Sequence, residues 1–296
     1  MIGEAVRSQA GAGPRLVARF RGAAAFAASS KLNLLGVILV GTVFGAAAFG
    51  ALLAPYPPDA ISLLERFQPP SATHLFGTDD YGRDLFSRVL AGARISVEVA
   101  AVVISISVTI GTLLGAVAGF FGGLVDEAIM RVTDLFLAFP ALILAAAIAA
   151  TWGGNLTTTV IALSTVYWPW YARLVRGQVL SLREREFVTA ATVSGAGPWD
   201  IMRRHLLPNV LPYVIIQISL DIGYVILSTS ALSFLGLGAQ PPTPEWGGMM
   251  TDARGFMREA WWFPTFPGLA LALTVLGFNL LGDGLRDWLD PRMRGR

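Results

Sequence analysis

The chain contains no cysteine among its 296 residues. A disulfide framework, a thiolate zinc site and a cysteine nucleophile are therefore excluded. The only lysine is Lys31, and a leucine follows it, so the sequence holds no phosphate-binding loop of the G-x-x-x-x-G-K-[ST] kind. We therefore expect a separate polypeptide to carry out any ATP hydrolysis on which the chain depends.

Charge is also scarce. Charged residues make up 14% of the chain and hydrophobic residues 54%, whereas roughly a quarter of an ordinary soluble domain is charged. This composition predicts an integral membrane protein. The net charge is only +2, and we expect a lipid bilayer and no nucleic acid among the partners.

Long apolar runs predict an all-α fold with six transmembrane helices. The first run, residues 32–54, is long enough to cross a hydrocarbon core of about 30 Å. It exceeds the apolar core of a cleavable signal peptide, so we expect it to be retained as a span. The other spans are predicted at residues 95–120, 135–151, 158–178, 210–235 and 266–285.

The distribution of basic residues predicts the orientation of these spans. Residues 1–31 and 286–296 form predicted cytosolic tails, and residues 95–285 form a five-helix core that contains a polar segment at residues 183–208. Basic residues are concentrated in the tails and in the polar segment. The positive-inside rule therefore places both termini and the segment in the cytosol.

Residues 55–94 are predicted to form an outer loop with a helix lying at the membrane interface. We expect that helix to begin at Thr78 or Asp79, because acidic residues favour the first turn. Asp84 and Arg88 are four residues apart, a spacing that predicts an ion pair along the helix.

Several features of the core predict how its helices pack. Gly111, Gly115 and Gly119 form a repeated G-x-x-x-G register, which lets another helix backbone approach closely. Pro169 should kink the fourth span, either as a hinge or as an anchored bend. The aromatic residues at 167–171 and Trp246, Trp261 and Trp262 are predicted to form interfacial belts.

Residues 183–208 are predicted to form two short helices separated by a glycine turn. In the first, residues 183–194, the small side chains of Ala190 and Ala191 allow close approach of another surface, on a face shared with Phe187 and Ser194. The stretch from Gly195 to Gly197 ends that helix, because glycine adopts backbone angles that other residues resist. The second helix begins at Pro198, and Pro208 is expected to interrupt it before the fifth span.

This segment resembles the EAA loop of ABC importer permeases. The resemblance rests on Ala190-Ala191, Gly195 and Leu207-Pro208; Thr189 and His205 depart from the family pattern, which usually has Glu and often Ile there. In that family the loop forms coupling helices that sit in a cleft of a separate ATPase subunit. The resemblance implies that the residues in contact with the ATPase are Phe187, Thr189, Ala190, Ala191, Gly195, Ala196, Pro198, Leu207 and Pro208. A cytosolic hairpin of ordinary alanine and glycine content is the alternative.

Residues 73–96 and 231–250 resemble the dipeptide, oligopeptide and nickel permeases of the same family. The resemblance implies a type I ABC importer permease core, which forms part of a pore for peptides or a related small solute. Thr229 stands where many members have Glu, so the cargo is left open.

The same resemblance implies the partners. They are a homologous permease subunit in a heterodimer, one or two ATPase subunits that bind ATP and Mg, and an extracytoplasmic substrate-binding protein. The chain itself is expected to bind no cofactor or metal and to be no enzyme. The implied location is the cytoplasmic membrane of a bacterium or archaeon.

Polar residues within the predicted spans are candidates for a translocation path. Gln217, Asp221 and Tyr224 lie on one side of the fifth span at helical spacing. An ionisable group at this depth faces protein or a wet cavity, so Asp221 either lines a path or bonds to a neighbouring helix. Asn279 in the last span is a candidate too, although an interhelix hydrogen bond explains it as well.

Two other functional classes compete with an importer subunit. A secondary transporter would need groups that bind a coupling ion within its spans, and Asp221 is the only candidate for such a group in the sequence. A membrane-embedded enzyme would need a cluster of active-site residues, whereas His74 and His205 are predicted on opposite sides of the membrane.

Overall fold

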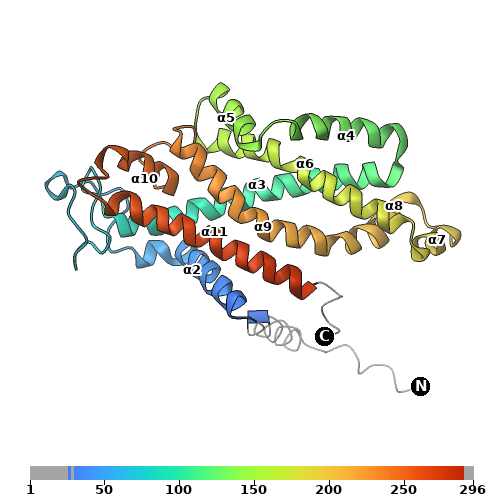
Figure 1. The fold of residues 1–296 in the computed structure, drawn as a ribbon, viewed down its shortest axis with the longest axis horizontal. Coiled ribbons are helices and arrows are strands. Elements are labelled where there is room, and N and C mark those ends of the chain that lie inside the picture. Colours follow the sequence, from blue (N-terminus) through green and yellow to red (C-terminus); the bar gives the residue numbers. More distant parts are fainter. Residues whose placement is uncertain (1–25, 28–29, 290–296) are drawn as a thin grey trace, which may run out of the picture.

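A computed structural model of the chain describes residues 26–27 and 30–289. Across those residues the regular structure is helical, apart from one isolated bridge between Thr78 and Asp84. The long helices form an elongated bundle, with α10 (Trp246–Asp252) at one end and α7 (Glu186–Val193) and α8 (Pro198–Asp200) at the other (Figure 1). The all-α fold predicted from the sequence is confirmed.

Helix α3 lies at the centre of the bundle. It packs against α2, α6 and α9, while α11 packs against α2 and α9. The longer helices are α2 (Lys31–Leu53), α3 (Leu85–Phe121), α4 (Gly123–Leu137), α5 (Ala141–Thr151), α6 (Leu156–Arg183), α9 (Leu207–Phe234) and α11 (Trp262–Leu289). Three short turns complete the fold: η1 (Leu63–Glu65), η2 (Ile201–Leu206), which is a π-helical turn, and η3 (Ala253–Phe256).

Within the described residues, four helical stretches are long and apolar enough to cross a membrane: α2, α3, residues 198–234 and residues 262–288. A fifth results if the bent pair of α4 and α5 counts as one span. Helix α6 has 28 residues and so the length to span, but its threonines, aromatics and arginines make it less apolar. The count of six spans therefore stays a prediction.

The glycine register of α3 faces α6. A Cβ placed on Gly111 would lie 2.4 Å from the Cβ of Tyr171, and a Cβ on Gly115 would lie 2.4 Å from the carbonyl oxygen of Ala172. The two backbones therefore meet in a contact that only glycine permits, as the G-x-x-x-G register predicts. This contact encloses one face of α6 in protein, which explains how a less apolar helix is accommodated.

The predicted interfacial helix is not a separate element, because α3 begins only at Leu85. Asp84 is the N-cap of α3, and its carboxylate accepts a hydrogen bond from the amide of Ser87 at 2.8 Å. The same carboxylate also lies 2.9 Å from Nδ1 of His74. The predicted ion pair between Asp84 and Arg88 is therefore wrong, because Asp84 caps the helix and contacts His74. Arg88 turns instead to the outer loops, where it donates to the carbonyl oxygens of residues 58 and 242.

The predicted third span, residues 135–151, is broken at Pro140. Helices α4 and α5 meet there at an angle of 85°, because proline disfavours helical angles in the residue before it. The polar residues from Asp126 to Asp134, which precede this predicted span, lie on α4. Helix α5 has 11 residues, about 16 Å at 1.5 Å per residue, and is too short to cross a bilayer alone.

Three of the tryptophans expected in interfacial belts, Trp168, Trp246 and Trp262, lie inside the protein. The indole of Trp246 donates to the carbonyl oxygen of Val89 at 3.0 Å, and that of Trp262 donates to the carbonyl oxygen of Thr78 at 3.1 Å. Trp261, by contrast, is exposed. These two bonds join the loop and helix around residues 78–89 to the later α10 and α11.

Candidate functional site

The segment that was predicted to couple to an ATPase forms one end of the bundle (Figure 1). Helix α6 ends at Arg183, α7 follows from Glu186 to Val193, and α8 begins at Pro198. The first short helix is therefore shorter than the predicted 183–194, because α6 itself continues to residue 183. The first short helix and the turn after it are otherwise confirmed, whereas the second helix is not a separate short one, because it continues into α9.

Gly195 makes the turn between the two helices. Its φ of +86° lies in the left-handed region, which glycine adopts without strain. The Gly195 amide donates to Thr192 and the Ala196 amide donates to Ala191, each at 3.0 Å. These two bonds form a Schellman motif, which satisfies the last carbonyls of α7 and fixes the direction of the chain.

Pro208 does not interrupt the second helix, contrary to the prediction. The chain is helical from Pro198 through Phe234, and α9 holds Pro208 in its first turn. The residues before it form a π-helical turn, in which the amide of Leu207 bonds to the carbonyl of Met202, five residues back. The π-helical turn ends directly before α9. The missing N–H of Pro208 therefore does not interrupt the series of helical hydrogen bonds.

The inner side of the segment is packed against the long helices. Val188, Ile201 and Leu206 are buried, and they form one apolar cluster with residues of α6 that include Tyr171 and Val175. Ala191 and Ala196 pack against the same cluster. The segment is therefore held firmly on α6 and α9, and a force on it reaches both helices.

The outer side of the segment is an open surface of small and apolar side chains. Phe187, Thr189 and Ala190 are exposed, and Val193 is 84% exposed. A hollow of about 520 Å³ lies here, lined by Glu184, Glu186, Thr189, Ala190, Val193 and Ser194. The predicted face is thus divided, since Ala191 turns inward while Phe187, Ala190 and Ser194 face out.

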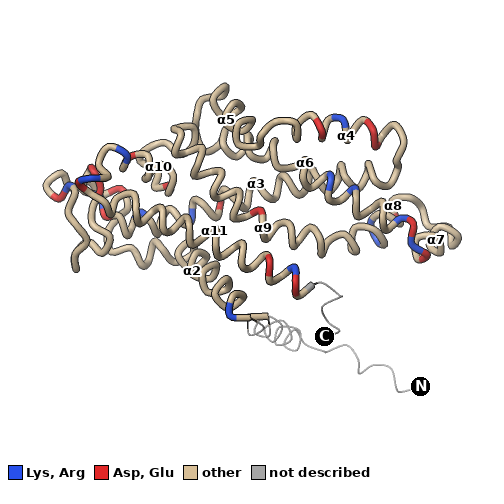
Figure 2. The backbone as a smooth tube through the Cα atoms, viewed as in Figure 1, with Lys and Arg blue, Asp and Glu red and all other residues tan. Residues whose placement is uncertain are grey.

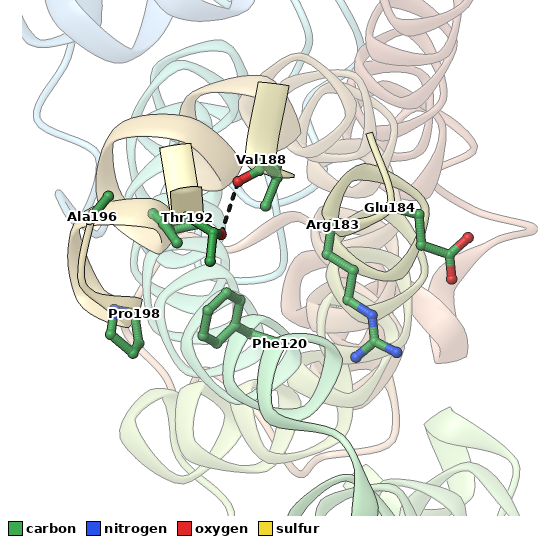
Figure 3. A pocket seen from close by; sticks show the side chains of 8 residues that line it. Phe120, Arg183, Glu184, Val188, Thr192, Ala196 and Pro198 are labelled. Carbon is green, nitrogen blue, oxygen red and sulfur yellow. Dashed lines mark hydrogen bonds between the residues drawn. The ribbon is translucent and has the colours of Figure 1, made fainter. Parts of the chain in front are cut away.

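A second hollow, of about 500 Å³, lies between the segment and the end of α3. Figure 3 shows Phe120 facing Thr192 and Pro198 across it, and Arg183 beside it. The guanidinium of Arg183 donates to the carbonyl oxygen of Gly119 at 3.0 Å. This bond ties the last turn of α6 to the last turn of α3.

Charged residues cluster at the two ends of the bundle and on α4, with largely uncharged helix between (Figure 2). At the segment end, Arg204 lies 3.4 Å from Asp200, and both side chains are exposed. The exposed surface there is therefore mixed in charge, with Glu184, Arg185 and Glu186 at the start of α7 and arginines on η2.

The candidates for a translocation path are only partly brought together. Asp221 is 7% exposed, and the amide of Gln217 donates to its Oδ1 at 2.9 Å. Tyr224 is 58% exposed, and Asn279 is half-buried on α11. The expectation that Asp221 is turned away from the surface is confirmed.

Tyr171, which was predicted to lie in an aromatic belt, lies inside the protein instead. It is fully buried and lies beside Asp221. Among the described residues, the Tyr171 hydroxyl and Oδ2 of Asp221 have no hydrogen-bond partner apart from each other. Tyr171 packs against Gly111 of α3, a contact between two helices that the local sequence pattern does not show.

Residues 111–295 match the family described as "Binding-protein-dependent transport system inner membrane component". The chain belongs to this family. It is an ABC importer permease, and ATPase and substrate-binding partners are general to such importers. The permease assignment made from the EAA-like segment is confirmed.

Relatives match nearly the whole permease. It is 44% identical over 285 residues, 96% of each chain, to the "Probable D,D-dipeptide transport system permease protein DdpC" of Escherichia coli. It is 45% identical over 265 residues, 90% of this chain and 87% of the relative, to the "Dipeptide transport system permease protein DppC" of Alkalihalophilus pseudofirmus. It is 42% identical over 272 residues, 90% and 97% of the two chains, to the "Nickel transport system permease protein NikC" of Escherichia coli.

A solved structure shares the fold of the permease. A chain of the MetNI methionine ABC transporter in an inward-facing conformation matches with a TM-score of 0.56 and 18% sequence identity. The match covers 68% of this chain and 96% of the other. About a third of this permease therefore lies outside the shared fold, and α2 and the outer loop precede the residues that match the family.

Proposed function

We propose that this permease forms one half of the pore of an ATP-driven importer for peptides or a related small solute. A homologous permease subunit supplies the other half in a heterodimer. The support is the identity of 42–45% to permeases whose names specify dipeptides or nickel. Peptides are the preferred cargo because the two dipeptide permeases are 44% and 45% identical to this permease, against 42% for the nickel permease.

The observation that carries the mechanism is the rigid attachment of the coupling segment, residues 183–208. Its buried side packs on α6, and its second helix continues into α9 without a break. When partner ATPase subunits bind ATP and Mg and close, the exposed side of α7 is displaced with them. Because the segment cannot bend at Gly195 without losing its two turn bonds, the displacement tilts α6 and α9 and changes which side the pore faces.

The proposed contacts with the ATPase come from the outer side of the segment: Phe187, Thr189, Ala190 and Gly195. Ala191, Ala196, Pro198, Leu207 and Pro208 support those contacts from behind, through the turn and the junction with α9. Thr189 lines the hollow of the exposed surface, so the hydroxyl would meet the ATPase where the family usually offers a carboxylate.

We further propose that the permease lies in the cytoplasmic membrane of a bacterium or archaeon with both termini in the cytosol. The coupling segment is then cytosolic, and the loops around α10 face the substrate-binding protein. The tails that support this orientation were predicted at residues 1–31 and 286–296, and most of their residues, 1–25, 28–29 and 290–296, lie outside the described residues.

A single-cysteine crosslink tests the proposal, because the natural chain has no cysteine. Val193→Cys places a thiol on the exposed side of α7, and Leu52→Cys places one at the opposite end of the protein. The two native side chains are equally exposed, at 84%. A thiol-to-amine crosslinker is applied to the importer complex in membranes, and the products are identified by mass spectrometry.

We expect Val193→Cys to crosslink to a nucleotide-hydrolysing subunit and Leu52→Cys not to do so. If neither variant reaches an ATPase although the complex transports substrate, the coupling role is wrong. Transport that is driven by an ion gradient in the absence of any ATPase would instead support a secondary transporter.

A further inference from the structure

An apolar groove lies where α2 meets the rest of the permease. It has a volume of about 370 Å³ and is lined by α2, α3 and α11, with Phe76 contributing from the outer loop and Trp246 from α10. Its lining includes Val43, Ala46, Val89, Ala93, Ala270 and Leu273. We call this the α2 groove.

The groove arises because α2 contacts α11 and α3 at different positions along its length. Near the middle of α2, a Cβ on Gly277 of α11 would lie 2.8 Å from the Cβ of Leu39, so these helices touch. At the end of α2, a Cβ on Gly50 would lie 3.1 Å from the carbonyl oxygen of Leu90 on α3. Beyond its contact with α11, α2 therefore follows α3, and a wedge opens between α2 and α11.

The polar groups in the lining are satisfied within the protein. The Thr42 hydroxyl donates to the carbonyl of Ile38 at 2.8 Å, and that of Thr274 donates to the carbonyl of Ala270 at 2.6 Å. The indole N–H of Trp246 is bonded to a backbone carbonyl of α3. The groove offers a water molecule or a peptide no free donor, so hydrocarbon is the occupant that costs least to bind.

The rim of the groove is continuous with the lipid-facing surface. Leu269 and Leu273 on α11 are exposed, and Thr42 is exposed on α2. Both helices are long and apolar enough to cross the bilayer, so these side chains meet lipid. A lipid chain can therefore enter the groove sideways without crossing a polar boundary.

We propose that the α2 groove binds one hydrocarbon chain of a membrane phospholipid, and that this chain joins α2 to the permease core. Helix α2 precedes the residues that match the family, whereas α11 lies within them. The bound chain fills the space that the two helices leave between them, where an empty apolar cavity would cost packing energy. The lipid is thus a structural component of the junction, independent of the transported cargo.

A matched pair of substitutions on α2 tests this site. Ala46→Phe fills the groove, whereas Ala48→Phe adds the same ring two residues away on the exposed side of the helix. The importer complex is purified in mild detergent and its retained phospholipids are counted by native mass spectrometry. We expect the unmodified complex and the Ala48→Phe variant to retain one tightly held phospholipid that the Ala46→Phe variant has lost.

A second measurement uses the unmodified permease. A phospholipid with a diazirine in its acyl chain is incorporated into membranes, and the photolabelled residues are mapped by peptide sequencing. Labelling concentrated on the groove residues of α2 and α11 supports the site. Uniform labelling of all lipid-facing leucines, or retention of the lipid by Ala46→Phe, would show that the groove holds no specific chain.

Discussion

Arg176 on α6 and Asp126 on α4 form a two-point ion pair, in which Nε and Nη2 of the guanidinium lie 2.5 and 2.6 Å from the two carboxylate oxygens. Arg173 and Asp134 form a second pair between the same helices, at 2.6 Å. Thr133 is the one buried residue of α4. The two ion pairs therefore contribute much of the attachment of α4 to α6, and α6 leads into the coupling segment.

A double-mutant cycle measures the first of these pairs. Arg176→Ala, Asp126→Ala and the double variant should show a coupling energy of about 1 kcal/mol in the unfolding of the detergent-solubilised complex. This is the upper end for partly exposed pairs, because two parallel bonds restrict each other's geometry. The coupling should fall as salt is raised.

Arg131 and Glu127 on the same helix provide the control. Their side chains are more exposed, and they meet at a single distance of 3.4 Å. Their coupling should be within about 0.5 kcal/mol of zero. Equal couplings in the two cycles would show that the pair between α4 and α6 has no special role.

The contact between α3 and α6 predicts that one added methyl group disrupts the bundle. Gly115→Ala would place its Cβ 2.4 Å from the carbonyl oxygen of Ala172, and overpacking of this kind costs about 1–3 kcal/mol. We expect a lower unfolding temperature and a lower yield of assembled complex. Gly177→Ala on α6 is the matched control, because a Cβ there meets nothing within 4 Å. A loss as large in Gly177→Ala would assign the effect to the glycine itself and not to the contact.

Local pattern was sufficient to predict the α3 glycine contact, the Gly195 turn and the interior position of Asp221. Each depends on a property of a few adjacent residues, such as small size, backbone freedom or the cost of a charge in an apolar run. The coupling role of residues 183–208 was inferred from the resemblance to importer permeases, because the spacing of residues alone does not indicate a contact with an ATPase.

The errors arose where the sequence allows several local geometries, or where a distant residue decides between them. Asp84 could pair with Arg88 by spacing, yet it caps α3 and contacts His74. Pro208 could end a helix, but a preceding π-helical turn absorbs the missing donor. The belt assignment failed for Trp246 because its partner, the carbonyl of Val89, is 157 residues away in the chain.

The outer loop should become more stable on acidification through Asp80. Burial, and next the neighbouring Asp79, raise the pKa of the Asp80 carboxyl, which also faces Arg83 and Asp252. Because its pKa is higher in the folded than in the unfolded state, the ionised carboxylate opposes folding at neutral pH. This opposition disappears as the pH falls through the raised pKa.

Asp80→Asn should therefore raise the unfolding temperature at pH 7, and the gain should shrink as the pH is lowered. Unfolding of the complex is followed across a pH series, with Glu259→Gln as a control at an exposed carboxylate of the same outer region. A destabilised Asp80→Asn at neutral pH would mean that the contact of Asp80 with Arg83, at 3.7 Å, outweighs the burial of its charge.

Cysteine substitution in this cysteine-free chain can decide whether Tyr224 lines the translocation path. Tyr224 on α9 is 58% exposed and Leu269 on α11 is 49% exposed, but we predict water beside the first and lipid beside the second. In the assembled importer, a charged, membrane-impermeant thiol reagent should modify Tyr224→Cys and leave Leu269→Cys unmodified. A lipid-soluble diazirine, which needs no thiolate, should label the unmodified chain at Leu269, while Asp221→Cys, at a buried position, should resist the thiol reagent. Labelling of Tyr224 by the diazirine, with no reaction of Tyr224→Cys with the thiol reagent, would place Tyr224 against lipid and remove it from the path.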